Sequence, residues 1–214
     1  TGLSAALELA EKGYRVALLE ARRVGWGASG RSGGQIIVGW GCDLSKLEKL
    51  LGRDDARHLF DWSSEAVDLI HRRREEHQID CDWRAGHVHV PIKPRQVSEL
   101  RGWQSDLAEH YDYQTDWWSA ERLQQHLGSR RYLGGLYDAQ SGHLHPLNYT
   151  LGVARAALAA GVQILEHSPV FALQPGESVS LQCPKGQLRA DFVVLAGNAY
   201  LGGLEPNLDR RIMP

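Results

Sequence analysis

Residues 1–20, TGLSAALELAEKGYRVALLE, decide the fold of this chain. Apolar side chains recur at i, i+3, i+4 and i+7 over positions 3–10, which predicts an amphipathic helix with one apolar face. Gly13 stands where a C′ glycine ends a helix, and residues 15–20 then form a short apolar run that ends in the acid Glu20. The segment therefore predicts a helix, a tight turn and a buried strand, which is typical of an α/β protein.

The composition is typical of a globular chain and lacks the excess of basic residues that nucleic-acid binding requires. With 214 residues and 43% hydrophobic content, the chain can bury a core as one domain or two small ones. The net charge is -2, and the arginine run HRRREEH at positions 71–77 contains acids, which predicts a solvated helix face. No signal peptide and no apolar run of about 20 residues are found, so we expect a cytoplasmic protein with no membrane partner.

No metal site is expected. Cys42, Cys81 and Cys183 lack the C-x-x-C spacing of zinc sites and redox dithiols, so they are predicted to be buried thiols in a reducing compartment. His143 and His145 alternate and would point the same way from a strand. A zinc site needs three or four ligands, and no third one is placed nearby.

The opening segment has the spacing of a dinucleotide-binding βαβ unit. Such a unit needs a glycine-rich turn, a helix whose N-terminus faces the pyrophosphate, and an acid about 20 residues on for the ribose. Gly2 and Glu20 fit the last glycine of G-x-G-x-x-G and that acid, whereas the first strand and first two glycines would lie before Thr1. The alternative is an ordinary helix and strand pair of an α/β protein, in which the same features also occur.

A second glycine-rich stretch, ARRVGWGASGRSGGQI, follows at residues 21–36. Five glycines in ten positions leave little room for a regular element, which indicates a backbone that passes close to a ligand and offers amide donors. Arg31 adds a cation at the same place. The alternative is a flexible surface loop, because glycine and serine clusters are also common there.

Together the two segments resemble the FAD-dependent oxidases of the D-amino-acid oxidase type, particularly the gamma-glutamylputrescine oxidase branch. The resemblance implies that Gly2 lies at the phosphate turn, Glu20 at the ribose, and Ser29 to Gln35 along the pyrophosphate and isoalloxazine. The FAD-binding residues that it implies are Gly2, Glu20, Ala21, Arg22, Ser29, Gly30, Arg31, Ser32, Gly33, Gly34, Gln35, Val170 and Gly197.

The middle of the chain lacks nucleotide-binding features. Helices are expected over 54–77 and 97–110, a strand at HVHVPI, 87–92, and extended chain with a turn at LGGLYDAQSGHLHP, 133–146. An amine could be bound by aromatic walls through cation–π contacts, but most aromatics here are expected to be packing residues. They are Trp103, Tyr111, Tyr113, Trp117, Trp118, Tyr132 and Tyr137.

The last third returns to alternating helix and strand. A helix is expected from Pro146 to Gly161, a strand at VQILEH, 162–167, and three strands over 168–196, of which the part Asp191 to Ala196 reads as a buried parallel strand. The resulting fold class is α/β. The resemblance implies an FAD/NAD(P)-binding Rossmann-like domain whose first strand is missing (1–42 and 146–214), with an inserted, partial mixed α/β substrate domain (43–145).

The resemblance implies oxidation of an amine or amino acid by hydride transfer to FAD, giving an imine or aldehyde and hydrogen peroxide. The partners would be that small molecule and oxygen or another electron acceptor. A flavin-dependent dehydrogenase using another acceptor and a non-catalytic, inactive fragment of an oxidase stay open, whereas the ASGRSGGQ stretch and the insertion disfavour an NAD-dependent dehydrogenase. The cofactor would carry the chemistry, so no catalytic residue is assigned.

Overall fold

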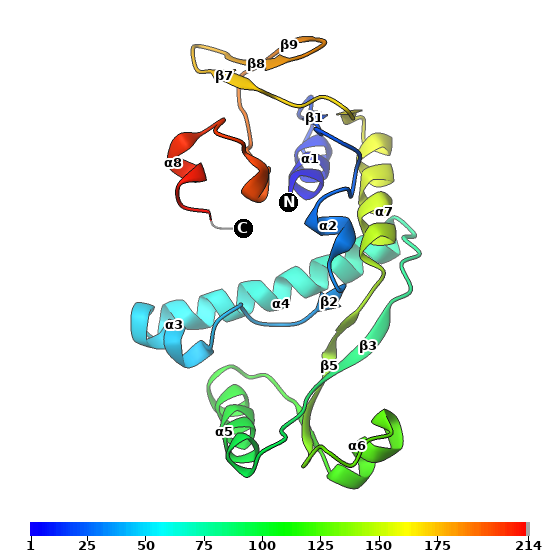
Figure 1. Ribbon diagram of the computed structural model, residues 1–214, viewed down its shortest axis with the longest axis vertical. Coiled ribbons are helices and arrows are strands. Elements are labelled where there is room, and N and C mark those ends of the chain that lie inside the picture. The colour runs from blue at the N-terminus through cyan, green and yellow to red at the C-terminus, as the bar shows by residue number, and fades with distance from the viewer. Residues whose placement is uncertain (213–214) are drawn as a thin grey trace. The chain divides into compact units, whose positions relative to one another are not determined.

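The structure, a computed structural model, describes residues 1–212, and of Asp209 only the backbone. The chain forms two compact units, which are described separately (Figure 1). Unit 1 contains Thr1–Ser32, His77–Asp80 and the chain from Pro146 onward, and unit 2 contains Gly33–Glu76 and Cys81–His145.

Unit 1 is built on a short parallel pair of strands covered by two helices. Strand β1 (Ala17–Leu19) pairs with β6 (Gln163–Leu165), and helix α1 (Gly2–Glu11) packs beside α7 (Pro146–Ala159). The helices meet through small and branched side chains, and both Leu7 and Ala157 are fully buried. The expected opening helix and the following strand are thus confirmed, the strand being shorter than predicted.

Glycines end both of these helices, as the sequence pattern indicates. Gly13 has φ +87° and Gly161 has φ +90°, which is the left-handed region that side chains with a Cβ rarely adopt. Each reverses the chain within a few residues, so β1 and β6 follow their helices directly.

The three-stranded meander is formed by β7 (Ala172–Gln174), β8 (Val179–Cys183) and β9 (Gly186–Ala190), all antiparallel. The expected continuation as a buried strand over 191–196 is wrong: these residues form no strand, and Phe192 and Val194 are 84% and 60% exposed. An apolar run becomes a strand only where another strand accepts its backbone hydrogen bonds, and no described strand pairs with this segment. The 3-10 helix η1 (Asn198–Tyr200) and helix α8 (Pro206–Asp209) follow.

Unit 2 is organised around its long strand β5 (Gly135–His143). Strand β3 (Arg84–His89) pairs with it antiparallel, as do β2 (Gln35–Ile36) near its end and β4 (Asp116–Trp118) near its start. The register of β3 shifts between Ala85 and His87, where Gly86 has φ +99°. A Cβ on Gly86 would lie 2.6 Å from the Tyr137 hydroxyl, so only glycine fits this bulge.

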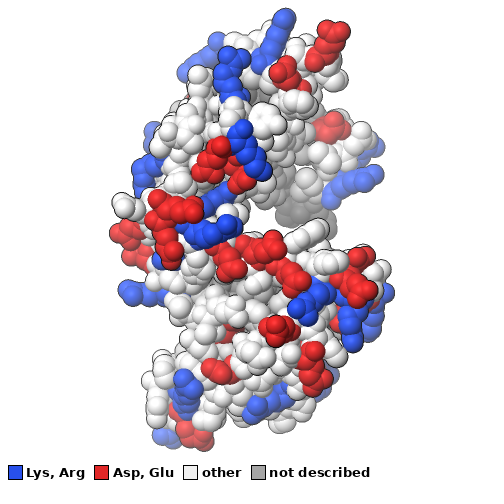
Figure 2. All heavy atoms as spheres, turned by 180° about the vertical axis from the view of Figure 1, so that it is seen from behind, with Lys and Arg blue, Asp and Glu red and all other residues white. Residues whose placement is uncertain are grey.

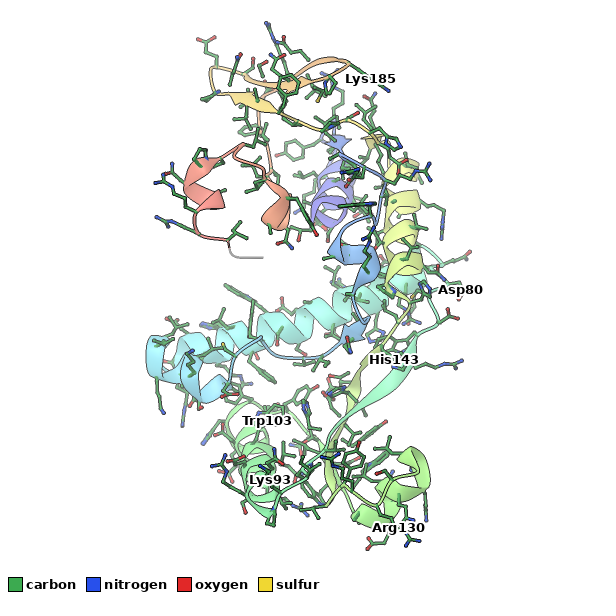
Figure 3. The ribbon with its side chains drawn as sticks, viewed as in Figure 1. Asp80, Lys93, Trp103, Arg130, His143 and Lys185 are labelled. Carbon is green, nitrogen blue, oxygen red and sulfur yellow. The ribbon has the colours of Figure 1, made fainter. Side chains whose placement is uncertain are left out.

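The helices of unit 2 are α3 (Leu44–Leu51), α4 (Arg53–Glu76), α5 (Pro94–His110) and α6 (Ala120–Leu127). Trp103 on α5 packs against the core of this unit (Figure 3). The packing role predicted for most aromatics is confirmed for Tyr111, Tyr113 and Trp118, which are buried. The buried core cluster consists of Val38, Phe60, Val67, Leu107, Tyr111 and Tyr113.

Two predictions about polar side chains are corrected. The run at 71–77 is not a fully solvated face, because Arg73 is buried and the Arg74 guanidinium lies 5.2 Å from the Trp83 ring centre. Long arginine stems can cover apolar surface, which a charge pattern does not reveal. Of the cysteines predicted to be buried, Cys81 is buried, but Cys42 is exposed and Cys183 is intermediate.

Candidate functional site

The first predicted site residue, Gly2, lies at a crowded helix start. A Cβ on Gly2 would lie 3.3 Å from the Ala196 Cβ and 3.9 Å from Leu18 Cδ1. The segment that leads to Gly197 therefore passes beside the N-terminus of α1. The N-cap, Thr1, makes no side-chain capping bond, and a helix N-terminus directs backbone N–H groups and the positive end of its dipole outward.

Glu20 follows β1 directly and is fixed by three hydrogen bonds. Its N–H donates to the Leu165 carbonyl (3.0 Å), and its own carbonyl accepts from the Ser168 N–H (2.9 Å). Its Oε1 accepts from the Arg22 N–H (2.8 Å), so one carboxylate oxygen orients the turn over residues 20–22. The acid is thus held at the carboxyl end of a parallel strand, where open α/β sheets bind ligands.

The chain after Glu20 is tied to the segment after β6. The Arg22 carbonyl accepts from the His167 N–H (2.8 Å), and the Val24 N–H donates to Glu166 Oε1 (2.7 Å). Ala21 and Arg22 therefore run beside residues 166–168, and Val170 follows two positions further on. Unit 1 thus brings these predicted site residues together, although they are far apart in the sequence.

The glycine-rich stretch contains a regular element after all. Helix α2 (Ala28–Arg31) forms a single turn, in a stretch expected to leave little room for a regular element. The Thr150 hydroxyl donates toward the Ser29 carbonyl (3.2 Å) and the Pro146 carbonyl (2.8 Å) and so links α2 to α7. Ser29, Gly30, Arg31 and Ser32 therefore lie on a turn anchored to a long helix.

Two glycines of this stretch are required by packing within the protein. A Cβ on Gly30 would lie 2.1 Å from the Gly25 carbonyl oxygen and 3.0 Å from Leu147 Cδ1. Gly25 has φ +77°, and its Cβ would lie 2.7 Å from the same Leu147 atom. The expected reason for these glycines was ligand approach, and the structure supplies an internal reason for this pair.

The sequence reasoning missed Trp26. The guanidinium groups of Arg22 and Arg31 lie 4.9 and 4.7 Å from the Trp26 ring centre, and the Tyr200 ring meets it edge-on at 6.0 Å. Trp26 is 39% exposed. The indole therefore contacts the guanidinium groups of two predicted site residues, Arg22 and Arg31, at the surface of unit 1. A tryptophan between two glycines, with arginines four before and five after it, is the signal that could have found it.

Gly33, Gly34 and Gln35 belong to unit 2. Gln35 begins β2 opposite His143, and the Gly34 carbonyl accepts from the Leu144 N–H (3.0 Å). A Cβ on Gly33 would lie 2.5 Å from the Gln35 side-chain oxygen. The glycines therefore let this segment fold tightly against the end of β5, marked by His143 in Figure 3.

A buried polar network fixes the chain that follows β2. The Val38 N–H donates to the Ser141 hydroxyl oxygen (3.1 Å), and Ser141 in turn donates to the buried Asp138 carboxylate (2.5 Å). The Tyr113 hydroxyl donates to both oxygens of Asp138, at 2.9 and 2.8 Å. Burial and the neighbouring carboxylate raise the pKa of Tyr113 far above its ordinary value, so it stays a hydrogen-bond donor.

Charged groups of both signs are mixed on one face of the described part of the molecule (Figure 2). On the face shown in Figure 2, acids and bases intermingle without a large region of one sign. Among residues 1–212, no group of three or more His, Cys, Asp or Glu side chains could hold a metal ion. No helix in this part of the chain is long and apolar enough to cross a membrane.

A family model described as FAD dependent oxidoreductase, DAO, matches residues 1–214. The chain belongs to this family. The DAO-family chain is 43% identical, over its whole length, to "Probable oxidoreductase OrdL" of Haemophilus influenzae and covers 51% of that protein. It is 40% identical, again over its whole length, to "Gamma-glutamylputrescine oxidoreductase" of Escherichia coli and covers 50% of it. It thus spans about half the length of the curated relatives it matches.

Solved structures confirm the α/β fold of the DAO-family chain. Glycine oxidase from Geobacillus kaustophilus superposes on 97% of this chain with a TM-score of 0.77 at 21% identity, and 55% of that protein is covered. L-proline dehydrogenase from P. horikoshii superposes on 95% with a TM-score of 0.75 at 19% identity, and 52% of it is covered.

FAD is the cofactor of this family, and the residues of unit 1 fit its adenosine diphosphate half. Gly2 is the first residue of α1, and Glu20 directly follows the neighbouring strand β1. Any side chain at position 2 would press on Ala196, so glycine keeps the helix start narrow. This combination of a glycine, a helix start and an acid is what phosphates and a ribose require.

Proposed function

We propose that the complete protein binds FAD and oxidises an amine or amino acid. The proposal is carried by the arrangement of Gly2, Glu20 and Arg22 at one end of the parallel pair in unit 1, in a chain of the DAO family. FAD held there would supply the acceptor for a hydride equivalent from the carbon that bears the amine nitrogen, and water would hydrolyse the imine so formed.

The protein's own residues would bind and orient the cofactor. The N–H groups at the start of α1 would donate to the pyrophosphate, and Glu20 would accept from the ribose hydroxyls. Arg22 and Arg31, held at Trp26, would supply positive charge beside the phosphates. Gly33 to Gln35 would line the flavin half, and Val170 and Gly197 the adenine and the phosphate turn.

The proposed division of labour assigns residues 1–42 and 146–214 to the cofactor and 43–145 to the substrate. We propose a gamma-glutamylputrescine-like amine as the substrate, because the Escherichia coli relative is named for such a compound. Molecular oxygen is the proposed electron acceptor, with hydrogen peroxide as its product.

The test uses the complete protein. A yellow flavin absorbance that bleaches when the amine is added without oxygen, and peroxide formed in step with turnover in air, are expected. A colourless protein would overturn the proposal, and bleaching without peroxide would replace oxygen by another acceptor.

A matched pair of variants tests the site itself. Glu20→Ala is expected to weaken FAD binding about 10-fold or more, since hydrogen bonds to charged groups contribute roughly 1.5–3 kcal/mol. Glu177→Ala, at an exposed residue between β7 and β8, removes the same charge and should leave FAD affinity unchanged. Equal effects of the two changes would reject the assigned role of Glu20.

A further inference from the structure

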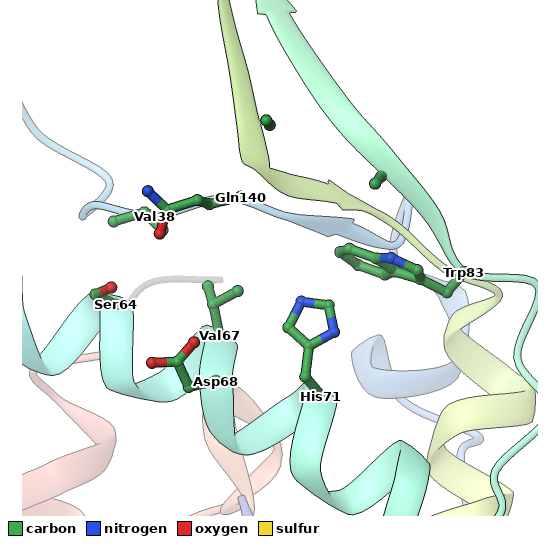
Figure 4. Close-up of a pocket in the computed structure, with 9 residues that line it drawn as sticks. Val38, Ser64, Val67, Asp68, His71, Trp83 and Gln140 are labelled. Atoms are coloured by element: carbon green, nitrogen blue, oxygen red, sulfur yellow. The ribbon is translucent and has the colours of Figure 1, made fainter. Parts of the chain in front are cut away.

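Acidic side chains are arranged differently in the two units. In unit 2 a cavity of about 200 Å³ lies between α4 and the sheet, and Figure 4 shows Asp68 on the helix side of it. Asp68 is the single acid among the described residues that line this cavity. In unit 1 two acids occur together, because Glu20 directly follows β1 and Glu166 directly follows β6. Two neighbouring carboxylates repel each other, so their pairing at one place calls for a physical reason.

The register of the parallel strands places these two acids at the same level. Leu19 is the register partner of Leu165, so Glu20 and Glu166 come next on strands that lie about 4.8 Å apart. The Glu20 N–H donates to the Leu165 carbonyl (3.0 Å), which continues the pairing past β1. Both acids therefore lie at the carboxyl end of the parallel pair, where open α/β sheets bind ligands.

Both carboxylates bond to the same short segment of chain. Glu20 Oε1 accepts from the Arg22 N–H (2.8 Å). Glu166 Oε1 accepts from the Val24 N–H (2.7 Å), only two positions further on. Each of these bonds uses one carboxylate oxygen, and the second oxygen of each acid can accept further hydrogen bonds. The two acids thus form one acceptor group over the turn that follows β1.

No contacting cation neutralises this pair. Within residues 1–212 neither Glu20 nor Glu166 forms an ion pair. The Arg22 guanidinium lies instead over the Trp26 ring, 4.9 Å from its centre. Two negative charges disfavour a third one nearby, and a phosphate monoester carries a charge of about -1.5 to -2. Free ribose hydroxyls, by contrast, donate hydrogen bonds that carboxylates accept.

We propose that Glu166 is a specificity-determining residue which, together with Glu20, excludes nucleotides that carry a phosphate on the adenosine ribose. The adenosine of FAD, whose 2′ and 3′ hydroxyls are free, is accepted. An adenosine with a 2′-phosphate, as in NADPH, is rejected by charge. The inference rests on the proposed function, because it requires the adenosine of FAD at Glu20. It adds to that function a second acid and a discrimination that FAD binding alone does not require.

The experiment uses the complete protein after removal of its flavin. ADP and 2′-phospho-ADP compete with FAD, and flavin fluorescence reports the FAD that stays bound. The wild type is expected to bind 2′-phospho-ADP at least about 10-fold more weakly than ADP, because the extra phosphate meets two carboxylates. Equal binding of the two nucleotides would overturn the proposal.

The variant Glu166→Gln separates the charge from the hydrogen bond. Glutamine keeps an oxygen that accepts from the Val24 N–H, so the affinities for FAD and ADP should stay within about 2-fold. The ratio of the ADP and 2′-phospho-ADP affinities should narrow about 3- to 10-fold, because one of the two charges is gone. A merely structural role of Glu166 would leave this ratio unchanged.

The variant Glu177→Gln is the matched control. It removes the same charge from an exposed residue between β7 and β8 of unit 1, so the ratio should stay as in the wild type. The proposal is rejected by an unchanged ratio in Glu166→Gln, and equally by the same narrowing in both variants, which would indicate a general effect of net charge.

Salt dependence gives a second measurement that needs no variant. Raising the ionic strength from about 0.05 M to about 0.5 M screens exposed charges, so the wild-type ratio should fall toward one. A ratio that does not respond to salt would indicate exclusion by shape and would overturn the role assigned to the two charges.

The same titrations keep the two proposals apart. A protein that binds FAD but discriminates without Glu166 rejects this inference alone. A protein that binds no FAD rejects the proposed function and this inference with it.

Discussion

Each of the two units of this protein is stabilised internally by a different kind of contact. In unit 2 a nine-residue strand, β5, pairs with three other strands, and a buried carboxylate, Asp138, is bonded from several sides. In unit 1 the parallel strands are three residues each, and the packing depends on glycines that no larger residue could replace. Unit 2 therefore combines a long paired strand with a buried carboxylate network, whereas unit 1 combines short strands with a glycine turn in which Gly25 and Gly30 approach closely.

This difference matches the tasks proposed for the two units. A narrow backbone and a helix start suit a long, negatively charged cofactor, because amide groups can then reach its phosphates. A sheet that is fixed from inside can present side chains to a small molecule with little movement. The predictions below test whether the two units respond separately.

The largest effect is expected from Asp138→Ala. The change leaves the Tyr113 and Ser141 hydroxyls and the Gln140 N–H (2.9 Å) without their buried acceptor. Each donor that stays buried without a partner costs about 1–3 kcal/mol, so the three together should lower the unfolding free energy by more than about 3 kcal/mol. Hydrogen exchange should show lost protection in β5, with the amides of β6 in unit 1 unaffected.

The milder change Tyr113→Phe serves as the control for Asp138. It removes one donor and leaves the carboxylate its other partners, so it should cost about 1.5–3 kcal/mol, the range for one hydrogen bond to a charged group. If the alanine variant were no less stable than the phenylalanine variant, the network would not stabilise unit 2 in the way described.

The next largest effect is expected from Gly30→Ala in unit 1. The new Cβ would overlap the Gly25 carbonyl oxygen, which is backbone and cannot rotate away. Overpacking of this kind costs about 1–3 kcal/mol and should displace α2 and weaken FAD binding. Thermal unfolding and FAD titration measure the two consequences.

Gly27→Ala is the matched control in the same stretch. Its Cβ would meet nothing closer than the Tyr200 ring at 3.7 Å, and its φ of -78° suits any residue. A small change is expected. Similar losses for both variants would mean that the whole stretch, and not the Gly25–Gly30 contact, resists substitution.

A pH dependence of stability is expected from unit 2. Burial lowers the pKa values of His87 and His89 below 6.5, although Asp138 partly opposes this. The unfolded chain then binds more protons than the folded chain, so stability is complete above pH about 6.5 and falls as the pH drops through the folded pKa values. His89 also lies close to His87, with ring centres 4.6 Å apart, which adds to its shift.

The double variant His87→Gln and His89→Gln tests this dependence. The difference in unfolding free energy between pH 7.5 and pH 5.5 should shrink relative to the wild type, while His58→Gln, at an exposed residue of α4, should leave it unchanged. An unchanged pH dependence in the double variant would show that other groups cause it.

How much the sequence predicts differs between these regions for a physical reason. The helices α1, α4, α5 and α7 were predictable because their apolar periods and their ends are local signals. The strand expected over 191–196 failed because strand formation depends on a partner elsewhere in the chain. The anchoring of Val38 by Ser141, 103 residues away, leaves no pattern in the sequence.

The candidate site follows the same division. Gly2 and Glu20 could be predicted because their spacing reports a local βαβ geometry. Trp26 left only a weak signal in the sequence, its flanking glycines and arginines, because its contacts with Arg22 and Arg31 arise from side chains that the fold brings together. Arg74 shows both cases: its contact with His71, three positions away on α4, is local, whereas its contact with Trp83 requires the turn after α4 to be known.

The smallest effect is expected from Trp26→Ala. This change tests whether side chains, as well as the backbone, organise the candidate site of unit 1. The change removes two cation–π contacts at a partly exposed ring, each contributing about 0.5–1 kcal/mol. Arg22 and Arg31 would then sample more rotamers, so FAD binding should weaken by less than about 10-fold while the fold persists. Trp62→Ala on α4, 60% exposed in unit 2, is the matched loss of a surface indole and should leave FAD affinity unchanged. If both variants bind FAD as the wild type does, the narrow backbone of unit 1 is sufficient for the cofactor and the arginine pair is not part of the site.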